Sequence, residues 1–301
     1  MIDQFLKYLL VEKRYSTHTH EAYKRDLGQF LTFLNAIYPG TTLSSVQHFH
    51  IRAWQVDLVT NKVTPRSINR KLSSLRSFYK FGIRKGYFKS NPLLKIIPPK
   101  TPKKLPATIP DNKLEPLLDN ESQHNKLSFS FLRDYLIIEL LYGTGMRRQE
   151  LIDLQTDSID RSYQQIKIIG KGNKQRIVPI TQQLIDSIDL YLEVLRDHFA
   201  QEELTTDGDY LILTDKGKRI YPKLVYNVVK RYLSTVTTAK KKSPHVLRHS
   251  FATHLMDNGA DLNAVKELLG HSSLSATQIY THNSIEKLKE VYKKSHPKAK
   301  K

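Results

Sequence analysis

The chain has 301 residues and carries 48 Lys and Arg against 29 Asp and Glu, which gives a net charge of +19. Hydrophobic residues make up 39% of it, enough for buried cores, and the length favours two domains. The absence of cysteine excludes a disulfide scaffold, a thiolate nucleophile and a cysteine-based zinc site, and it fits a reducing cytoplasm. No apolar stretch is long enough for a membrane span, and the start of the chain has no signal-peptide pattern, so we expect a soluble intracellular protein.

Most of the positive charge lies in the first third of the sequence. Before Pro106 there are 19 Lys and Arg but only 5 Asp and Glu, a net charge of +14. A surface this basic favours a nucleic-acid partner, because it releases the counterions that condense on phosphates. Charge alone also allows a merely solvated surface. An anionic membrane would require a basic amphipathic anchor with exposed aromatic residues, which the basic segments here do not resemble.

The first hundred residues predict a small all-helical module. Apolar residues recur at helical spacing, and Ser16 or Thr17 opens the second helix, which Pro39-Gly40 ends. Pro65 is tolerated in the first turn of the fourth predicted helix. The predicted helices span residues 2–13, 17–38, 49–61 and 66–80.

The fourth of these helices has one apolar and one basic face. Ile68, Leu72, Leu75 and Tyr79 can line a core, while four basic residues are expected to project outward. Such a face suits contacts to a DNA backbone or groove. The predicted DNA-binding residues are Arg66, Arg70, Lys71 and Arg76, and we expect loss of Arg70 and Arg76 to weaken DNA binding and its salt dependence.

A basic linker follows the helical module. Residues 96–110 contain five prolines, which prevent regular structure and indicate a stiff connection. The sequence therefore predicts a DNA-binding domain at 1–95, a linker at 96–110 and a second domain at 111–301. Two domains joined in this way could close around a duplex as a C-shaped clamp.

The second domain is predicted to be mainly α-helical with a small β-sheet. Two short strands at 165–169 and 176–180 are joined by a turn in which Gly172-Asn173 tolerates positive φ, which indicates a hairpin. Helices are expected on both sides of it, at residues 114–118, 129–142, near 148, 182–199, 223–234, 244–258 and 262–269.

Four ordered motifs lie in this second domain. They are Gly143-Thr144-Gly145-Met146-Arg147-Arg148-Gln149-Glu150-Leu151, Gly170-Lys171-Gly172-Asn173-Lys174, Pro244-His245-Val246-Leu247-Arg248-His249, and Leu269-Gly270-His271 followed by Tyr280. Together they strongly resemble the tyrosine recombinases, most closely the bacterial Xer type, and the helical module resembles the SAM-like core-binding domain of that family. One such motif alone would be weak evidence for the family, but four motifs in this order are specific to it.

The resemblance implies attack of the Tyr280 oxygen on a DNA phosphodiester, giving a 3′-phosphotyrosyl link and a free 5′-hydroxyl. Arg147 and Arg248 match the catalytic arginines, and guanidinium forks suit the charge that develops on phosphate oxygens. Lys171 matches the general acid, with Lys174 as a rival. His271 matches a phosphate-binding or assisting group. Glu150 resembles a supporting acid that could orient Arg147 or form an ordinary salt bridge.

His245 matches the base that takes the proton of Tyr280, whose free phenol has a pKa of about 10. Its spacing of three from Arg248 places both on one face of a helix. His245, His249 and His254 could also be assembled into a metal site, but Arg248 lies between them and no nearby carboxylate completes the set. We therefore expect no metal and no cofactor.

The resemblance implies double-stranded DNA as partner, no membrane, and a homo- or hetero-tetramer, with itself or with a paralogous recombinase, that exchanges strands through a Holliday junction. Chromosome dimer resolution is the expected role, and the start of the first helix close to Met1 favours simple recombination sites. Integration or inversion of mobile DNA, a type IB topoisomerase and a non-catalytic DNA-binding protein are the alternatives. The stripe of Ile285, Leu288 and Tyr292 could dock on a neighbouring protomer or on its own domain.

Overall fold

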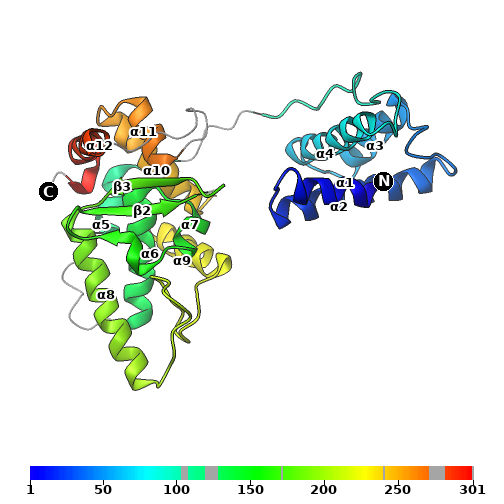
Figure 1. Ribbon diagram of the computed structural model, residues 1–301. Helices are drawn as coiled ribbons and strands as arrows, with labels where there is room; N and C mark the ends of the chain where they lie inside the picture. Colours follow the sequence, from blue (N-terminus) through cyan, green and yellow to red (C-terminus); the bar gives the residue numbers. More distant parts are fainter. Residues whose placement is uncertain (103–107, 119–127, 171, 240, 271–281, 300–301) are drawn as a thin grey trace. The chain divides into compact units, whose positions relative to one another are not determined.

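The computed structural model describes residues 1–102, 108–118, 128–170, 172–239, 241–270 and 282–299. Two compact units make up the chain, residues 1–104 and 105–301, so the division falls inside the proline-rich segment (Figure 1). Each unit has its own apolar core. Among the described residues, no helix has the length and apolar character needed to cross a bilayer.

The N-terminal unit is a bundle of the four predicted helices. α4 contacts each of the other three, and Phe5, Phe30, Trp54 and Phe78 form the centre of the core. Side-chain oxygens of Ser16 and Thr64 cap α2 and α4, as is usual where these residues precede a helix. The helices are α1 (Ile2–Val11), α2 (Thr17–Ile37), α3 (His48–Thr60) and α4 (Pro65–Arg84).

One residue of the predicted basic face of α4 does not project outward. Lys71 is buried, and its ammonium donates to Asp26 at 3.1 Å and to Gln29 on α2. Asp26 is fully buried and also accepts hydrogen bonds from Arg70 and, at 2.8 Å, from Ser74. The expectation of an exposed Lys71 is therefore wrong, because a buried carboxylate on the neighbouring helix requires cationic partners.

The C-terminal unit is built around α6, whose side chains are buried on almost every side. α6 contacts α7, α8, α9 and α10, which explains why its apolar residues are not confined to one stripe; its buried charged residues, Arg133, Asp134 and Glu139, form ion pairs. The helices of this unit are α5 (Asp111–Leu118), α6 (Phe129–Thr144), α7 (Arg148–Ile152), α8 (Gln182–Gln201), α9 (Pro222–Val236), α10 (Pro244–Asp257), α11 (Leu262–Leu269) and α12 (His282–Ser295), with short 3₁₀ turns at Thr156–Ser158 and Pro297–Ala299.

A small antiparallel sheet completes this unit and confirms the predicted mainly α fold class. β2 (Gln165–Ile169) pairs with β3 (Gln175–Pro179), with Ile166 opposite Val178, and β1 (Ile159–Asp160) is a further strand that the sequence did not predict. Positive φ angles at Gly172 and Asn173 form the hairpin turn as expected. β3 contacts α11 and α12, so the hairpin lies at the end of the unit where these helices gather (Figure 1).

Two residues of the predicted stripe on α12 pack against their own unit. Leu288 and Tyr292 are buried in the core, and the Tyr292 hydroxyl donates to the Gly143 carbonyl at 2.8 Å. Lys298, just beyond the helix, forms a 2.9 Å ion pair with the buried Glu139 of α6. In the single chain, Leu288 and Tyr292 therefore pack on their own domain, the second of the two alternatives left open, while the side chain of Ile285 lies outside the described residues.

Candidate active site

A glycine turn between α6 and α7 positions Arg147. Gly145 ends α6 with a φ of +60°, and a Cβ at this position would lie 2.5 Å from the Phe251 ring and 3.0 Å from Leu269. Only glycine therefore fits here. Arg147 follows as the N-cap of α7, half-buried, whereas the adjacent Arg148 is exposed.

Glu150 holds Arg147 from the first turn of α7. Its carboxylate accepts hydrogen bonds of 2.7 Å from the backbone N–H of Arg147, from Nη1 of Arg147 and from Nη2 of Arg176. Burial raises the pKa of Glu150, but the hydrogen bonds and charges of Arg176 and Arg147 outweigh it and bring the pKa to about 2. The carboxylate is therefore ionised at neutral pH and forms ion pairs with both Arg147 and Arg176.

Arg248 lies at the buried base of the same site. α10 presents it towards two backbone carbonyls, Gly145 at 2.5 Å from Nη1 and Leu269 at 2.6 Å from Nη2. Burial lowers the pKa of Arg248 to about 9, and the charges of Arg147 and Arg176 act in the same direction. The guanidinium stays charged at neutral pH. An anion bound beside it would stabilise this buried positive charge.

Three arginines from three elements meet at the C-terminal end of α11. Arg176 donates to the carbonyl of Leu268, Arg248 to that of Leu269 and Arg147 to that of Gly270, at 2.8, 2.6 and 3.3 Å. Cations at this end also complement the helix dipole. With Glu150, the carboxylate that Arg147 and Arg176 share, the group has three positive charges and one negative, hence a net charge of +2, and can accept an anion such as phosphate.

Of the six predicted catalytic residues, the structure brings Arg147 and Arg248 together. His245 occupies the first turn of α10, three residues before Arg248, and its side chain is exposed. Lys171, His271 and Tyr280 lie outside the described residues. Residue 271 directly follows the glycine whose carbonyl Arg147 contacts.

The histidine that a metal site would also need is engaged elsewhere. Nδ1 of His254 lies 2.9 Å from the Tyr142 hydroxyl, which in turn donates to Asp111 at 2.9 Å. These contacts connect α10, α6 and α5. His254 therefore contributes to packing.

On α4, the predicted DNA-binding residues Arg66, Arg70 and Arg76 are exposed. Arg70 is also bonded through both terminal nitrogens to Asp26, which restricts its guanidinium. Arg66 and Arg76 are thus the members of the set best placed to reach a partner.

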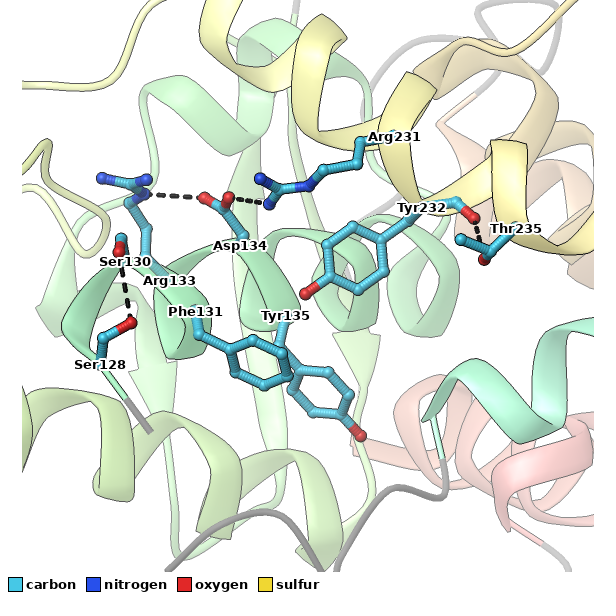
Figure 2. A pocket seen from close by; sticks show the side chains of 9 residues that line it. All are labelled: Ser128, Ser130, Phe131, Arg133, Asp134, Tyr135, Arg231, Tyr232 and Thr235. Carbon is cyan, nitrogen blue, oxygen red and sulfur yellow. Dashed lines mark hydrogen bonds and ion pairs between the residues drawn. The ribbon is translucent and has the colours of Figure 1, made fainter. Parts of the chain in front are cut away.

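A cavity of about 610 Å³ lies between α6 and α9, and none of the predicted site residues lines it. Figure 2 shows the side chains that line this cavity. Its aromatic walls include Phe131, Tyr135 and Tyr232, and Asp134 lies between Arg133 and Arg231 and is ion-paired with both. The carboxylate and its partners satisfy one another, so this arrangement connects the two helices.

Comparison with known families agrees with the fold. Residues 108–287 match the phage integrase family, and residues 2–86 match the N-terminal SAM-like domain of phage integrases. The chain belongs to the phage integrase family, the class of enzymes that includes the tyrosine recombinases.

The similarity to Xer recombinases covers the full chain. Tyrosine recombinase XerC of Chlorobaculum parvum is 37% identical over 99% of this chain and 94% of the relative, and XerD of Staphylococcus saprophyticus is 36% identical over 99% of both. This chain is accordingly a tyrosine recombinase of the Xer type.

Solved structures share the fold. XerH bound to a palindromic difH substrate, in a post-cleavage complex, aligns with a TM-score of 0.69 at 22% identity over 96% of this chain and 83% of that one. A lambda integrase dimer bound to a COC′ core site aligns with a TM-score of 0.67 at 17% identity over 91% and 73%.

Proposed function

We propose that the protein is a site-specific DNA recombinase that cleaves and rejoins DNA through a 3′-phosphotyrosyl intermediate. The observation that carries this proposal is the convergence of Arg147, Arg248 and Arg176 at the end of α11 with a net positive charge. Fixed guanidinium donors in a largely buried site suit a pentacoordinate phosphorus whose nonbridging oxygens gain negative charge.

In the proposed step, the Tyr280 oxygen attacks phosphorus and the bond to the 5′-oxygen breaks. His245 takes the proton of the phenol, and Lys171 gives a proton to the departing 5′-oxygen. Arg147, Arg248 and His271 hold the phosphate. Because the new phosphotyrosyl bond conserves the energy of the old phosphodiester, a 5′-hydroxyl from another strand can reverse the step without a nucleotide cofactor.

The Xer-named relatives support chromosome dimer resolution as the role. We propose that four protomers, of this chain alone or with a paralogous recombinase, pair two duplexes and exchange strands through a Holliday junction. That role requires the enzyme to work on chromosomal DNA in the cytoplasm. The N-terminal unit and the catalytic unit would then bind the duplex as two parts of a clamp. The domain boundaries of this proposal are the predicted ones, 1–95 and 111–301, with the linker at 96–110.

The test is covalent capture on DNA. A binding site is first selected from a pool of random duplexes, and a nicked version of it, which loses its short 5′-hydroxyl strand after cleavage, is incubated with the protein. We expect a protein–DNA adduct on a denaturing gel with the wild type and none with Tyr280→Phe. A bound duplex that gives no adduct, or an adduct that persists in Tyr280→Phe, would contradict the proposal.

A second prediction concerns the basic face of α4. Replacing Arg66 and Arg76 by alanine should weaken DNA binding about tenfold at moderate salt. It should also make the slope of log K against log salt shallower by about 1 to 2, because fewer counterions are released on binding when phosphate contacts are lost. A filter-binding series over several salt concentrations measures both. Arg161→Ala, which removes an exposed arginine from the other unit, is the control. An unchanged slope would show that α4 does not contact the backbone.

A further inference from the structure

Arg176 is a buried arginine that the sequence placed only in a strand. Its side chain is 4% exposed and points from β3 into the unit. Nε donates to the Leu268 carbonyl at 2.8 Å and Nη2 to Oε2 of Glu150 at 2.7 Å. Burying a guanidinium is costly, so two directed bonds with good geometry at this position call for an explanation beyond packing.

The contact with Glu150 changes the electrostatics of Arg147. If Glu150 had Arg147 as its sole cationic partner, the pair would be neutral and the carboxylate would compete with a phosphate for the same guanidinium. Arg176 shares the carboxylate: it takes Oε2, while Nη1 of Arg147 binds Oε1. The attraction of Glu150 for Arg147 is thereby divided, and positive charge remains available to an anion.

The contact with Leu268 fixes the backbone that leads to residue 271. Gly270 ends α11 with a φ of +64°, and a Cβ there would lie 3.0 Å from Cδ of Arg176, so the turn packs directly on this side chain. Arg176 thus joins the hairpin strand after Lys171, the Arg147 turn and the α11 end before His271.

We propose that Arg176 is a positioning residue for phosphate chemistry, which acts through Glu150 on Arg147 and through Leu268 on the end of α11. This inference rests on the proposed function and adds to it the residue that leaves the positive charge of Arg147 available to phosphate and holds the Arg147 turn and the end of α11 in position. Arg176 itself need not touch DNA.

The first test compares cleavage with binding. In Arg176→Met, which keeps an unbranched side chain but removes the charge and the donors, we expect single-turnover formation of the nicked-duplex adduct to slow about 100-fold, since small displacements of aligned groups cost about this much. The Kd for the same duplex should change less than about threefold, because the outer phosphate contacts remain. Arg161→Met, which removes an exposed arginine from its ion pair with Asp189, is the matched control and should retain the wild-type rate.

A double-variant cycle separates positioning from general stability. If Arg176 acts through Glu150, the variant with both Arg176→Met and Glu150→Gln should cleave no more slowly than the slower single variant, because it leaves neither a Glu150 carboxylate without Arg176 nor a buried Arg176 guanidinium without Glu150. Independent structural effects would instead multiply the two losses, and that result would overturn the inference.

Arg176→Lys covers the case in which the methionine variant does not fold. An ammonium keeps the positive charge but cannot donate to Glu150 and Leu268 in the planar fork geometry, so we expect a rate between those of the wild type and the methionine variant. A lysine variant as fast as the wild type would overturn the inference. A wild type that forms no adduct would instead contradict the proposed function, so the two failures are distinguishable.

Discussion

Replacing Arg248 by lysine should slow formation of the phosphotyrosyl adduct about 10³-fold, the order expected when a fixed donor to the transition state is removed. The guanidinium binds the Gly145 and Leu269 carbonyls through Nη1 and Nη2 and has further N–H donors for phosphate. A lysine ammonium is a compact point charge that cannot reproduce this planar set. Burial and the neighbouring arginines, which lower the pKa of Arg248, would lower that of a lysine there as well.

The measurement is a single-turnover time course of the adduct at saturating protein, with the Kd of the same duplex measured separately. Arg148→Lys is the matched control, because Arg148 adjoins Arg147 in sequence but is exposed. The Kd of the Arg248→Lys variant should stay within about threefold of the wild type, since one phosphate contributes a small part of the total. If Arg248→Lys formed the adduct within about tenfold of the wild-type rate, Arg248 would not be a principal donor to the reacting phosphate.

Local periodicity and turn chemistry predicted most of the fold. α11 and β2 have the predicted bounds, and most other helices differ by a few residues, because helix ends depend on capping and packing that extend beyond a local pattern. β1 was missed because two residues cannot show an alternating pattern. It exists through its pairing with β2, at Ile159 opposite Ile166.

The site was predictable in part. Arg147 and Arg248 lie in dense local motifs, whereas the importance of Arg176 depends on Glu150, 26 residues away, and on Leu268, 92 residues away. A signal was present nonetheless: Arg176 and Val178 both point inward on β3, so the alternation placed a charge among core positions. The prediction that Lys71 projects outward was wrong for the same reason: its position depends on a distant residue, because its partner Asp26 is on another helix.

Replacing Asp26 by alanine should lower the free energy of unfolding of the N-terminal unit by about 3–5 kcal/mol, the range for breaking a buried ion pair on one side. Asp26 is fully buried and accepts hydrogen bonds from Arg70, Lys71 and Ser74. Without it, the buried ammonium of Lys71 would lose its charged partner. Because domains of this size are stable by about 5–15 kcal/mol, the loss would bring the unit close to its unfolding threshold.

Trp54 makes the stability of the N-terminal unit measurable in the full chain. It is the sole tryptophan of the sequence and lies in the core of the N-terminal unit, so its fluorescence during urea titration reports on that unit. Asp57→Ala, which removes a carboxylate bonded to Asn61 on the surface of α3, should change the transition by less than about 1 kcal/mol. Replacing both Asp26 and Lys71 by leucine should recover most of the loss, because a buried ion pair can be exchanged for apolar contacts while a lone buried charge cannot be tolerated. A double variant as unstable as Asp26→Ala would show instead that the hydrogen bonds of Arg70 and Ser74 to the carboxylate hold α2 against α4.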